Sequence, residues 1–153
     1  MSLSEMYHVG IVVPDLEAGQ AHLTELLGTI WGPIVEGDVE MRDGAGKDLL
    51  VPNRICYSTG FPYLELIQEA PGTPWVCNEH SNLHHIGFYA TDLGIASGRL
   101  STSHCPLEIS GRTGADAPTT FTYHRDPLRV RIEFVDAGMR ETMEQWLMQP
   151  PQG

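Results

Sequence analysis

The sequence has few basic residues. Lysine and arginine together number nine, against twenty aspartates and glutamates, so the formal net charge is −11. A surface of this sign repels phosphate backbones, which argues against a nucleic-acid partner. It argues more weakly against highly anionic substrates, because a local basic patch could override the global field.

Long hydrophobic runs and paired cysteines are also absent from the sequence. No run approaches the roughly 20 apolar residues of a membrane-spanning helix, and no charged segment followed by an apolar one opens the chain as a secretory signal would. The three cysteines, Cys56, Cys77 and Cys105, form no CxxC pair. We therefore expect reduced thiols, a cytoplasmic location and no membrane partner.

One phrase occurs twice in the 153 residues. HVGIVVPDL begins at His8 and HIGFYATDL begins at His85. Each phrase opens on a β-branched, apolar stretch that predicts a strand, and each ends on Asp-Leu at the start of a helical pattern. The helical patterns cover residues 15–28 and 92–103.

Three further strand candidates follow each helical pattern. The order strand–helix–three strands, written twice, predicts an α+β fold in which two similar units share one domain over residues 1–153. We place the units at about 6–69 and 83–137, with a last helix at about 138–148. The further strands are expected at residues 29–41, 54–59, 62–68, 107–110, 119–124 and 129–136, with loops at 43–48 and 69–82.

Strand alternation puts each histidine of the phrase on the face opposite the apolar residues. His8 shares its face with Gly10, and His85 shares its face with Gly87. A glycine at this place leaves open space beside the imidazole, as a ligand cavity needs. We expect the apolar faces to lie under the helices.

The closing strand of each unit carries one glutamate, Glu65 in the first and Glu133 in the second. A carboxylate between apolar neighbours is costly to bury unless something pairs with it. Glu133 has a second interpretation, since Arg129 or Arg131 on its own strand face would also pair with it. Each unit thus offers one inward histidine and one inward glutamate.

Two imidazoles and two carboxylates suit a divalent ion such as Zn, Mn, Co, Ni or Fe(II). Four protein ligands on an octahedral ion leave two positions for water or substrate, which is typical of Lewis-acid chemistry. Tyr63 and Tyr89 share the faces of Glu65 and His85 and are predicted to contact the substrate. We expect His84 to be structural or exposed, and His124 to be solvated or at the cleft rim.

The paired phrases, with YLELIQ and IEFVD closing the units, resemble the vicinal-oxygen-chelate superfamily from about Tyr7 to Asp136. This superfamily includes glyoxalase I, methylmalonyl-CoA epimerase, extradiol dioxygenases, and bleomycin- and fosfomycin-resistance proteins. The resemblance is closest to epimerase-like and glyoxalase-like members. It implies two βαβββ modules that form a curved mixed sheet around a central cleft. The metal positions that it implies are His8, Glu65, His85 and Glu133.

The resemblance implies a metal-dependent isomerase, epimerase or lyase. The ion would stabilise enolate-like charge next to a carbonyl of a small oxygenated substrate, and Glu133 or Glu65 would move the proton. Two departures affect the assignment to a subfamily: the turn before the last strand, DPLRVRIEF, lacks the usual glycine, and the first helix lacks the usual Phe-Tyr pair. Because relatives often dimerise, a homodimer stays open.

Two other functions remain open at this stage. Resistance-type relatives bind a drug in the same cleft without chemistry, and the four-residue set argues against that function. Extradiol-type dioxygenases hold Fe(II) with two histidines and one glutamate, an arrangement that Glu65 would crowd. Within the leading class, the shortage of basic residues disfavours a coenzyme A thioester, and no sequence feature specifies a glutathione pocket.

Overall fold

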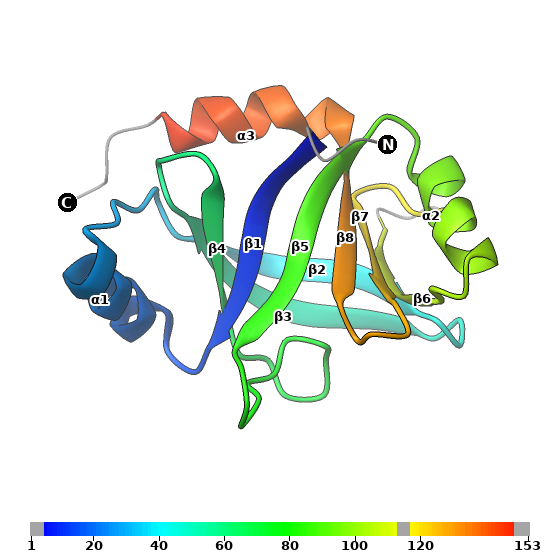
Figure 1. The fold of residues 1–153 in the computed structure, drawn as a ribbon, viewed down its shortest axis with the longest axis horizontal. Coiled ribbons are helices and arrows are strands. Elements are labelled where there is room, and N and C mark those ends of the chain that lie inside the picture. Colours follow the sequence, from blue (N-terminus) through cyan, green and yellow to red (C-terminus); the bar gives the residue numbers. More distant parts are fainter. Residues whose placement is uncertain (1–4, 113–116, 149–153) are drawn as a thin grey trace.

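The fold is a mixed α+β arrangement built on a closed sheet of eight strands (Figure 1). The computed structural model describes residues 5–112 and 117–148. The elements in chain order are β1 (Met6–Val13), α1 (Leu16–Leu27), β2 (Val35–Asp43), β3 (Asp48–Tyr57), β4 (Tyr63–Gln68), β5 (Leu83–Ala90), α2 (Leu93–Thr102), β6 (Leu107–Gly111), β7 (Phe121–Arg125), β8 (Arg131–Asp136), a 3-10 turn (Ala137–Met139) and α3 (Arg140–Leu147).

The strand order around the sheet is β1-β4-β3-β2-β6-β7-β8-β5. β1 pairs in parallel with β4 and β5 pairs in parallel with β8, whereas β1 and β5 are antiparallel neighbours. Helices α1 and α2 lie outside the sheet on opposite sides, and α3 runs across one end of it (Figure 1).

The repeated Asp-Leu starts both outer helices. The side chain of Asp15 accepts a hydrogen bond from the backbone N–H of Ala18, and Asp92 accepts one from Ile95. Each aspartate thus caps a helix by accepting from a backbone N–H that has no partner within the helix. The leucine that follows, Leu16 or Leu93, is buried against the sheet, which fixes the helix start.

The apolar strand faces lie under the helices in part. Ile11 and Val13 of β1 pack with α1, and Phe88 and Ala90 of β5 pack with α2. The histidine-bearing faces point to the inside of the barrel, where His8 is fully buried. The sequence therefore sorts apolar and ligand-type side chains onto opposite faces of the same two strands.

The largest difference from the predicted elements lies in the β2–β3 hairpin. We expected strands at 29–41 and 54–59, but β2 begins at Val35 and β3 begins at Asp48. The turn between them is tightened by Asp43, whose side chain accepts hydrogen bonds from the N–H groups of Ala45 and Lys47. Most of β2 is exposed and polar, so it carries little of the alternation that marks a half-buried strand.

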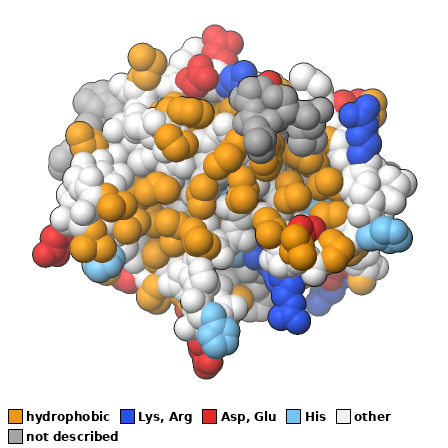
Figure 2. Space-filling view, in the orientation of Figure 1, with side chains coloured by type: hydrophobic (Ala, Val, Ile, Leu, Met, Phe, Trp, Pro, Cys, Tyr) orange, Lys and Arg blue, Asp and Glu red, His pale blue; other side chains and the backbone are white. Residues whose placement is uncertain are grey.

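All three cysteines are free thiols, as expected. Among the described residues, no helix combines the length and the apolar character needed to cross a bilayer. Hydrophobic side chains gather on the outer face shown in Figure 2, in the region of β1, β4 and β5. Val9, Ile11 and Ile86 are only half-buried there.

Candidate metal centre

Two rows of residues that are neighbours on the inner face of the sheet bring the predicted ligands together. In one row, Gly10 of β1 pairs with Glu65 of β4 on one side and with His85 of β5 on the other. In the next row, Gly87 of β5 pairs with His8 of β1 and with Glu133 of β8. Each row therefore holds a glycine between a histidine and a glutamate.

The donor atoms of these four residues converge on one point. The Nε2 atom of His8 lies 2.9 Å from Oε2 of Glu133 and 3.4 Å from Oε2 of Glu65. The Nε2 atom of His85 lies 3.1 Å from Oε2 of Glu65 and 3.2 Å from Oε2 of Glu133. All four donor atoms lie within 4.8 Å of one another, and all four residues are buried.

The glycines provide the seats for the two rings. A Cβ atom built on Gly87 would lie 1.9 Å from Cε1 of His8, and one built on Gly10 would lie 2.1 Å from Cε1 of His85. The expectation of open space beside each imidazole is therefore wrong in one respect. The space is real, but the histidine of the other unit fills it, because β1 and β5 run antiparallel.

The residues present fit a divalent metal ion. The Oε2 atoms of Glu65 and Glu133 are buried and form no regular hydrogen bond with a described residue; they face the histidine Nε2 atoms at ion-pair distances. The two Nε2 atoms lie only 2.6 Å apart, a separation at which at most one of them can hold a proton. Two imidazole nitrogens and two carboxylate oxygens are a common donor set for a borderline divalent ion.

The protonation of the cluster in the absence of metal follows from its charges. Burial lowers the pKa of His85, but the negative charges of Glu133 and Glu65 raise it by more, so that the pKa is about 9. Burial likewise lowers the pKa of His8, and the two carboxylates outweigh it, so the pKa is raised. For Glu133 burial raises the pKa, and the histidines outweigh it, so this pKa is lowered. The groups are thus held as an ion-pair cluster that an ion would replace.

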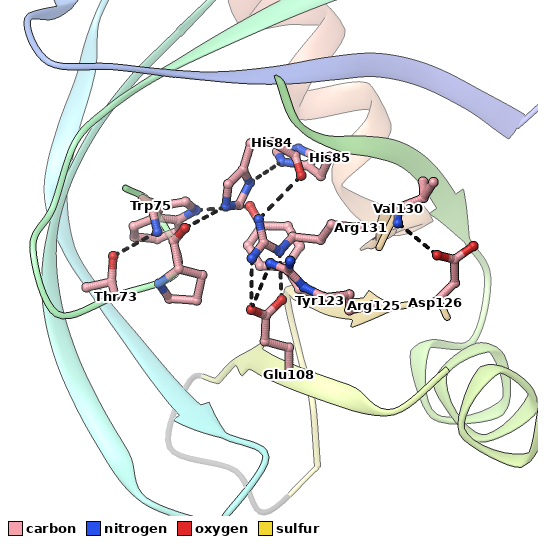
Figure 3. A network of polar contacts seen from close by, with 11 residues as sticks. Thr73, Trp75, His84, His85, Glu108, Tyr123, Arg125, Asp126, Val130 and Arg131 are labelled. Atoms are coloured by element: carbon pink, nitrogen blue, oxygen red, sulfur yellow. Dashed lines mark hydrogen bonds and ion pairs between the residues drawn. The ribbon is translucent and has the colours of Figure 1, made fainter. Parts of the chain in front are cut away.

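His84 sets the orientation of His85 (Figure 3). Its Nε2 atom lies 2.8 Å from the carbonyl oxygen of Pro74, which can only accept, so Nε2 carries the proton. Burial, together with the positive charge of Arg131, lowers the pKa of His84 to about 3, so the ring is neutral and its Nδ1 is an acceptor. That Nδ1 lies 2.9 Å from Nδ1 of His85, which must therefore be the donor. The Nε2 lone pair of a neutral His85 is thereby aimed at the cluster.

Arg131 holds the backbone of this histidine pair and leaves Glu133 to the cluster. Its guanidinium binds Glu108 with two hydrogen bonds of 2.6 Å and 2.8 Å, and it also donates to the carbonyl of His84 (Figure 3). The alternative in which Glu133 pairs with Arg131 is therefore wrong, because Arg131 is bound to a different carboxylate.

Tyr57 positions the carboxylate of Glu65. Its hydroxyl donates a 2.5 Å hydrogen bond to Oε1, the oxygen that does not face the cluster. Burial, together with the negative charge of Glu65, raises the pKa of Tyr57 well above its usual value, so the phenol keeps its proton. Sequence reasoning missed Tyr57, although it shares the inner face of β3 with Ile55.

A cavity of about 290 Å³ that is open to solvent on one side reaches the cluster. Glu65 and Glu133 line it, whereas neither His8 nor His85 does. Val35 and Met139, which also line it, are 43% and 36% exposed and mark its open side. A small molecule in this cavity would meet the carboxylate side of the centre first.

The family model described as the Glyoxalase/Bleomycin resistance protein/Dioxygenase superfamily matches residues 7–123. The chain belongs to this superfamily. No curated protein matches it.

Solved structures of this superfamily's fold agree with the architecture. The methylmalonyl-CoA epimerase of Mycobacterium tuberculosis is 18% identical, with a TM-score of 0.57 and 92% of each chain covered. A variant of the Streptomyces coelicolor methylmalonyl-CoA epimerase, in complex with 2-nitronate-propionyl-CoA, is 16% identical with a TM-score of 0.54, covering 86% of this chain and 96% of that one. At such identities the likeness concerns the fold alone.

The remaining sequence predictions for this superfamily member concern Tyr63, Tyr89 and two histidines. Neither tyrosine is among the described residues that line the cavity. Both line a smaller hollow beside Arg140, where Tyr89 stacks on Tyr7, so their contact with substrate stays a prediction. His84 is buried, as a structural residue would be.

His124 was expected to be solvated or at the cleft rim, which is wrong. It is fully buried, with hydrogen bonds to Ser97 and to the carbonyl of Cys105. Its strand, β7, runs one residue further than predicted, to Arg125. His124 therefore lies inside the strand rather than at its end.

Proposed function

We propose that this superfamily member is a metal-dependent enzyme, an isomerase, epimerase or lyase, that moves a proton next to the carbonyl of a small oxygenated substrate. The observation that carries the proposal is the convergence of four buried donor atoms beside a cavity that two of the four residues, Glu65 and Glu133, help to line. A site built only to bind an apolar molecule has no use for two buried carboxylates that are packed against two histidines.

In this proposal, residues 6–69 and 83–137 form two βαβββ modules around one metal centre. Each module would give one histidine from its first strand and one glutamate from its last. The ligands would be His8, Glu65, His85 and Glu133, around Zn, Ni, Co, Mn or Fe. Such an ion supplies Lewis-acid stabilisation of negative charge on a carbonyl oxygen.

Glu133 is the proposed general base. Tyr57 holds Oε1 of Glu65 by a hydrogen bond, which ties that carboxylate to the wall. No described residue donates a hydrogen bond to Oε1 of Glu133, and this carboxylate lines the cavity. A carboxylate that is free at one oxygen can take a proton from a substrate carbon and return it. Glu65 could act as the base only if its hydrogen bond with Tyr57 were broken.

Hydrogen–deuterium exchange tests the proposed chemistry. The metal-loaded protein would be incubated in heavy water with hydroxyacetone and with 2-hydroxyacetophenone, and loss of the proton next to the carbonyl followed by proton NMR. We expect exchange above the protein-free rate, reduced at least a hundredfold in Glu133→Gln. The matched control is Glu17→Gln, an exposed carboxylate on α1 that is paired with Arg54. Exchange that survives in both Glu133→Gln and Glu65→Gln would refute the assignment.

The same preparations separate the alternative functions. Full binding of 2-hydroxyacetophenone after chelation, without exchange, would favour a binding protein. Oxygen uptake by the Fe(II)-loaded protein with catechol would favour a dioxygenase. A homodimer stays a prediction, to be tested by light scattering.

A further inference from the structure

We infer that the substrate of this centre is uncharged and carries a compact apolar body, such as a single aromatic ring, next to its chelating oxygens. This inference rests on the proposed function and adds the substrate class to it. It follows from three properties of the cavity: its walls, its charge and its size.

The walls are mostly hydrocarbon and aromatic. Among the described lining residues, the polar ones are the two glutamates, three tyrosines, Asn53 and Thr120. One tyrosine hydroxyl is committed to Glu65, and another, on Tyr123, accepts from the indole N–H of Trp75. The apolar and indole wall consists of Val35, Val39, Ile55, Ile67, Trp75, Phe121, Val135, Met139 and Met143.

The described residues that line the cavity offer no countercharge for an anionic substrate. No lysine or arginine is among the described residues that line it. The two positive charges of a divalent ion would be balanced by Glu65 and Glu133, so an additional carboxylate or phosphate on the substrate would be unpaired. Burying an unpaired charge against apolar walls is strongly unfavourable.

Five of the eight arginines are bound to carboxylates outside the cavity. Arg42 is bound to Asp48, Arg54 to Glu17 and Glu36, and Arg140 to Glu5. Arg125 and Arg131 share Glu108. A substrate with a phosphorylated carrier, such as the coenzyme A derivative bound by the Streptomyces relative, would find these five cations already paired.

The volume limits the body of the substrate. A cavity of about 290 Å³ is at the small end of ligand pockets, which run from roughly 300 to 1,000 Å³. One ring with a short oxygenated side chain fills such a space. The aromatic side chains of Trp75, Phe121 and Tyr123 provide edges and faces against which a ring packs.

Hydroxamic acids test this inference without turnover, because they chelate a metal through two oxygens. The Co²⁺-loaded protein would be titrated with acetohydroxamic, benzohydroxamic and 4-carboxybenzohydroxamic acids, followed by its visible spectrum and by calorimetry. The three probes share the chelating group and differ in the body. We expect benzohydroxamic acid to bind at least tenfold more tightly than either of the other two.

A pair of variants checks that the preference comes from the cavity wall. Val39→Lys places a cation in the lining and should bring the affinity for 4-carboxybenzohydroxamic acid up to or above that for benzohydroxamic acid. Leu50→Lys, on the exposed face of the neighbouring β3, should leave the order unchanged. The wild-type series decides the inference even if Val39→Lys does not fold.

The outcomes separate the two proposals. Equal affinity for acetohydroxamic and benzohydroxamic acids, or tighter binding of the carboxylated probe, would overturn the substrate class while leaving the metal centre standing. A protein that takes up no Co²⁺, or whose Co²⁺ spectrum no hydroxamate changes, would overturn the proposed function and this inference with it.

Discussion

The imidazole of His8 lies against the backbone of Gly87, so closely that a methyl group on residue 87 would lie 1.9 Å from Cε1 of the ring. The reciprocal contact joins His85 and Gly10. Because the two strands are antiparallel neighbours with His8 opposite Gly87, a spacing of two residues places each histidine across from the other unit's glycine. The repeated His-x-Gly is therefore the means by which two strands seat two rings side by side.

A methyl group at residue 87 should disrupt the centre. We expect Gly87→Ala to lower the free energy of unfolding by about 1–3 kcal/mol, as overpacking of a filled interior does, and to weaken zinc binding at least tenfold. The measurements are urea unfolding and competition with a zinc chelator. The control is Gly98→Ala on α2, where an added Cβ meets nothing within 4 Å and should stabilise the helix by about 0.5–1 kcal/mol. Wild-type zinc affinity in Gly87→Ala would contradict the seating argument.

His84 should matter for metal affinity although its own ring lies outside the cluster. In His84→Phe the Nδ1–H of His85 loses its acceptor, so the ring is no longer held with Nε2 toward the cluster. Loss of such a supporting contact typically weakens metal binding by about 10- to 100-fold. His124→Phe removes another buried histidine, one that contacts Ser97 rather than the cluster, and should lower stability without changing metal affinity. Equal metal affinities in the two variants would contradict the role of His84.

Much of the fold and of the cluster could be predicted because their signals are local or repeated. The alternation around His8 and His85 fixes which face each ring takes, and Asp-Leu marks both helix starts. The glutamates were found because a carboxylate among apolar strand neighbours is unusual. The duplication then indicated that the four residues belong to one site, since it places one histidine and one glutamate at equivalent positions of the two units.

The parts that could not be predicted depend on pairing between distant strands. Nothing in the sequence near Tyr57 indicates that it donates to Glu65, because β3 and β4 must first pair for Tyr57 to lie opposite Glu65. His84 was expected to be structural or exposed and is buried, but its contact with Pro74 depends on the path of the loop that joins the halves. The start of β3 was missed because Pro52 interrupts a stretch that pairs with the exposed strand β2.

Removal of the Tyr57 hydroxyl should act through Glu65. We expect Tyr57→Phe to cost about 1–3 kcal/mol of stability in the metal-free protein, because a buried charged acceptor loses its donor. With Glu65 no longer tied to the wall, metal affinity should fall several-fold. Tyr123→Phe removes another buried hydroxyl, one that accepts a hydrogen bond from Trp75, so it should leave metal affinity near wild type. Calorimetric titration with zinc compares the two, and a larger loss in Tyr123→Phe would contradict the assignment.

Metal uptake should release protons, and its pH dependence has a definite sign. The pKa of His85 is raised to about 9 in the metal-free protein, so the ring is an imidazolium at pH 7.5. A metal ligand must offer a lone pair, so this proton has to leave when the ion binds. Apparent affinity should therefore increase as pH rises from 6 toward 9 and level off above the pKa. Adding zinc chloride to weakly buffered protein at pH 7.5 should acidify the solution, and His85→Gln should release fewer protons. Zinc binding that is strong at pH 7.5, independent of pH and without acidification would show that His85 is already neutral and that its carboxylate neighbours do not hold it charged.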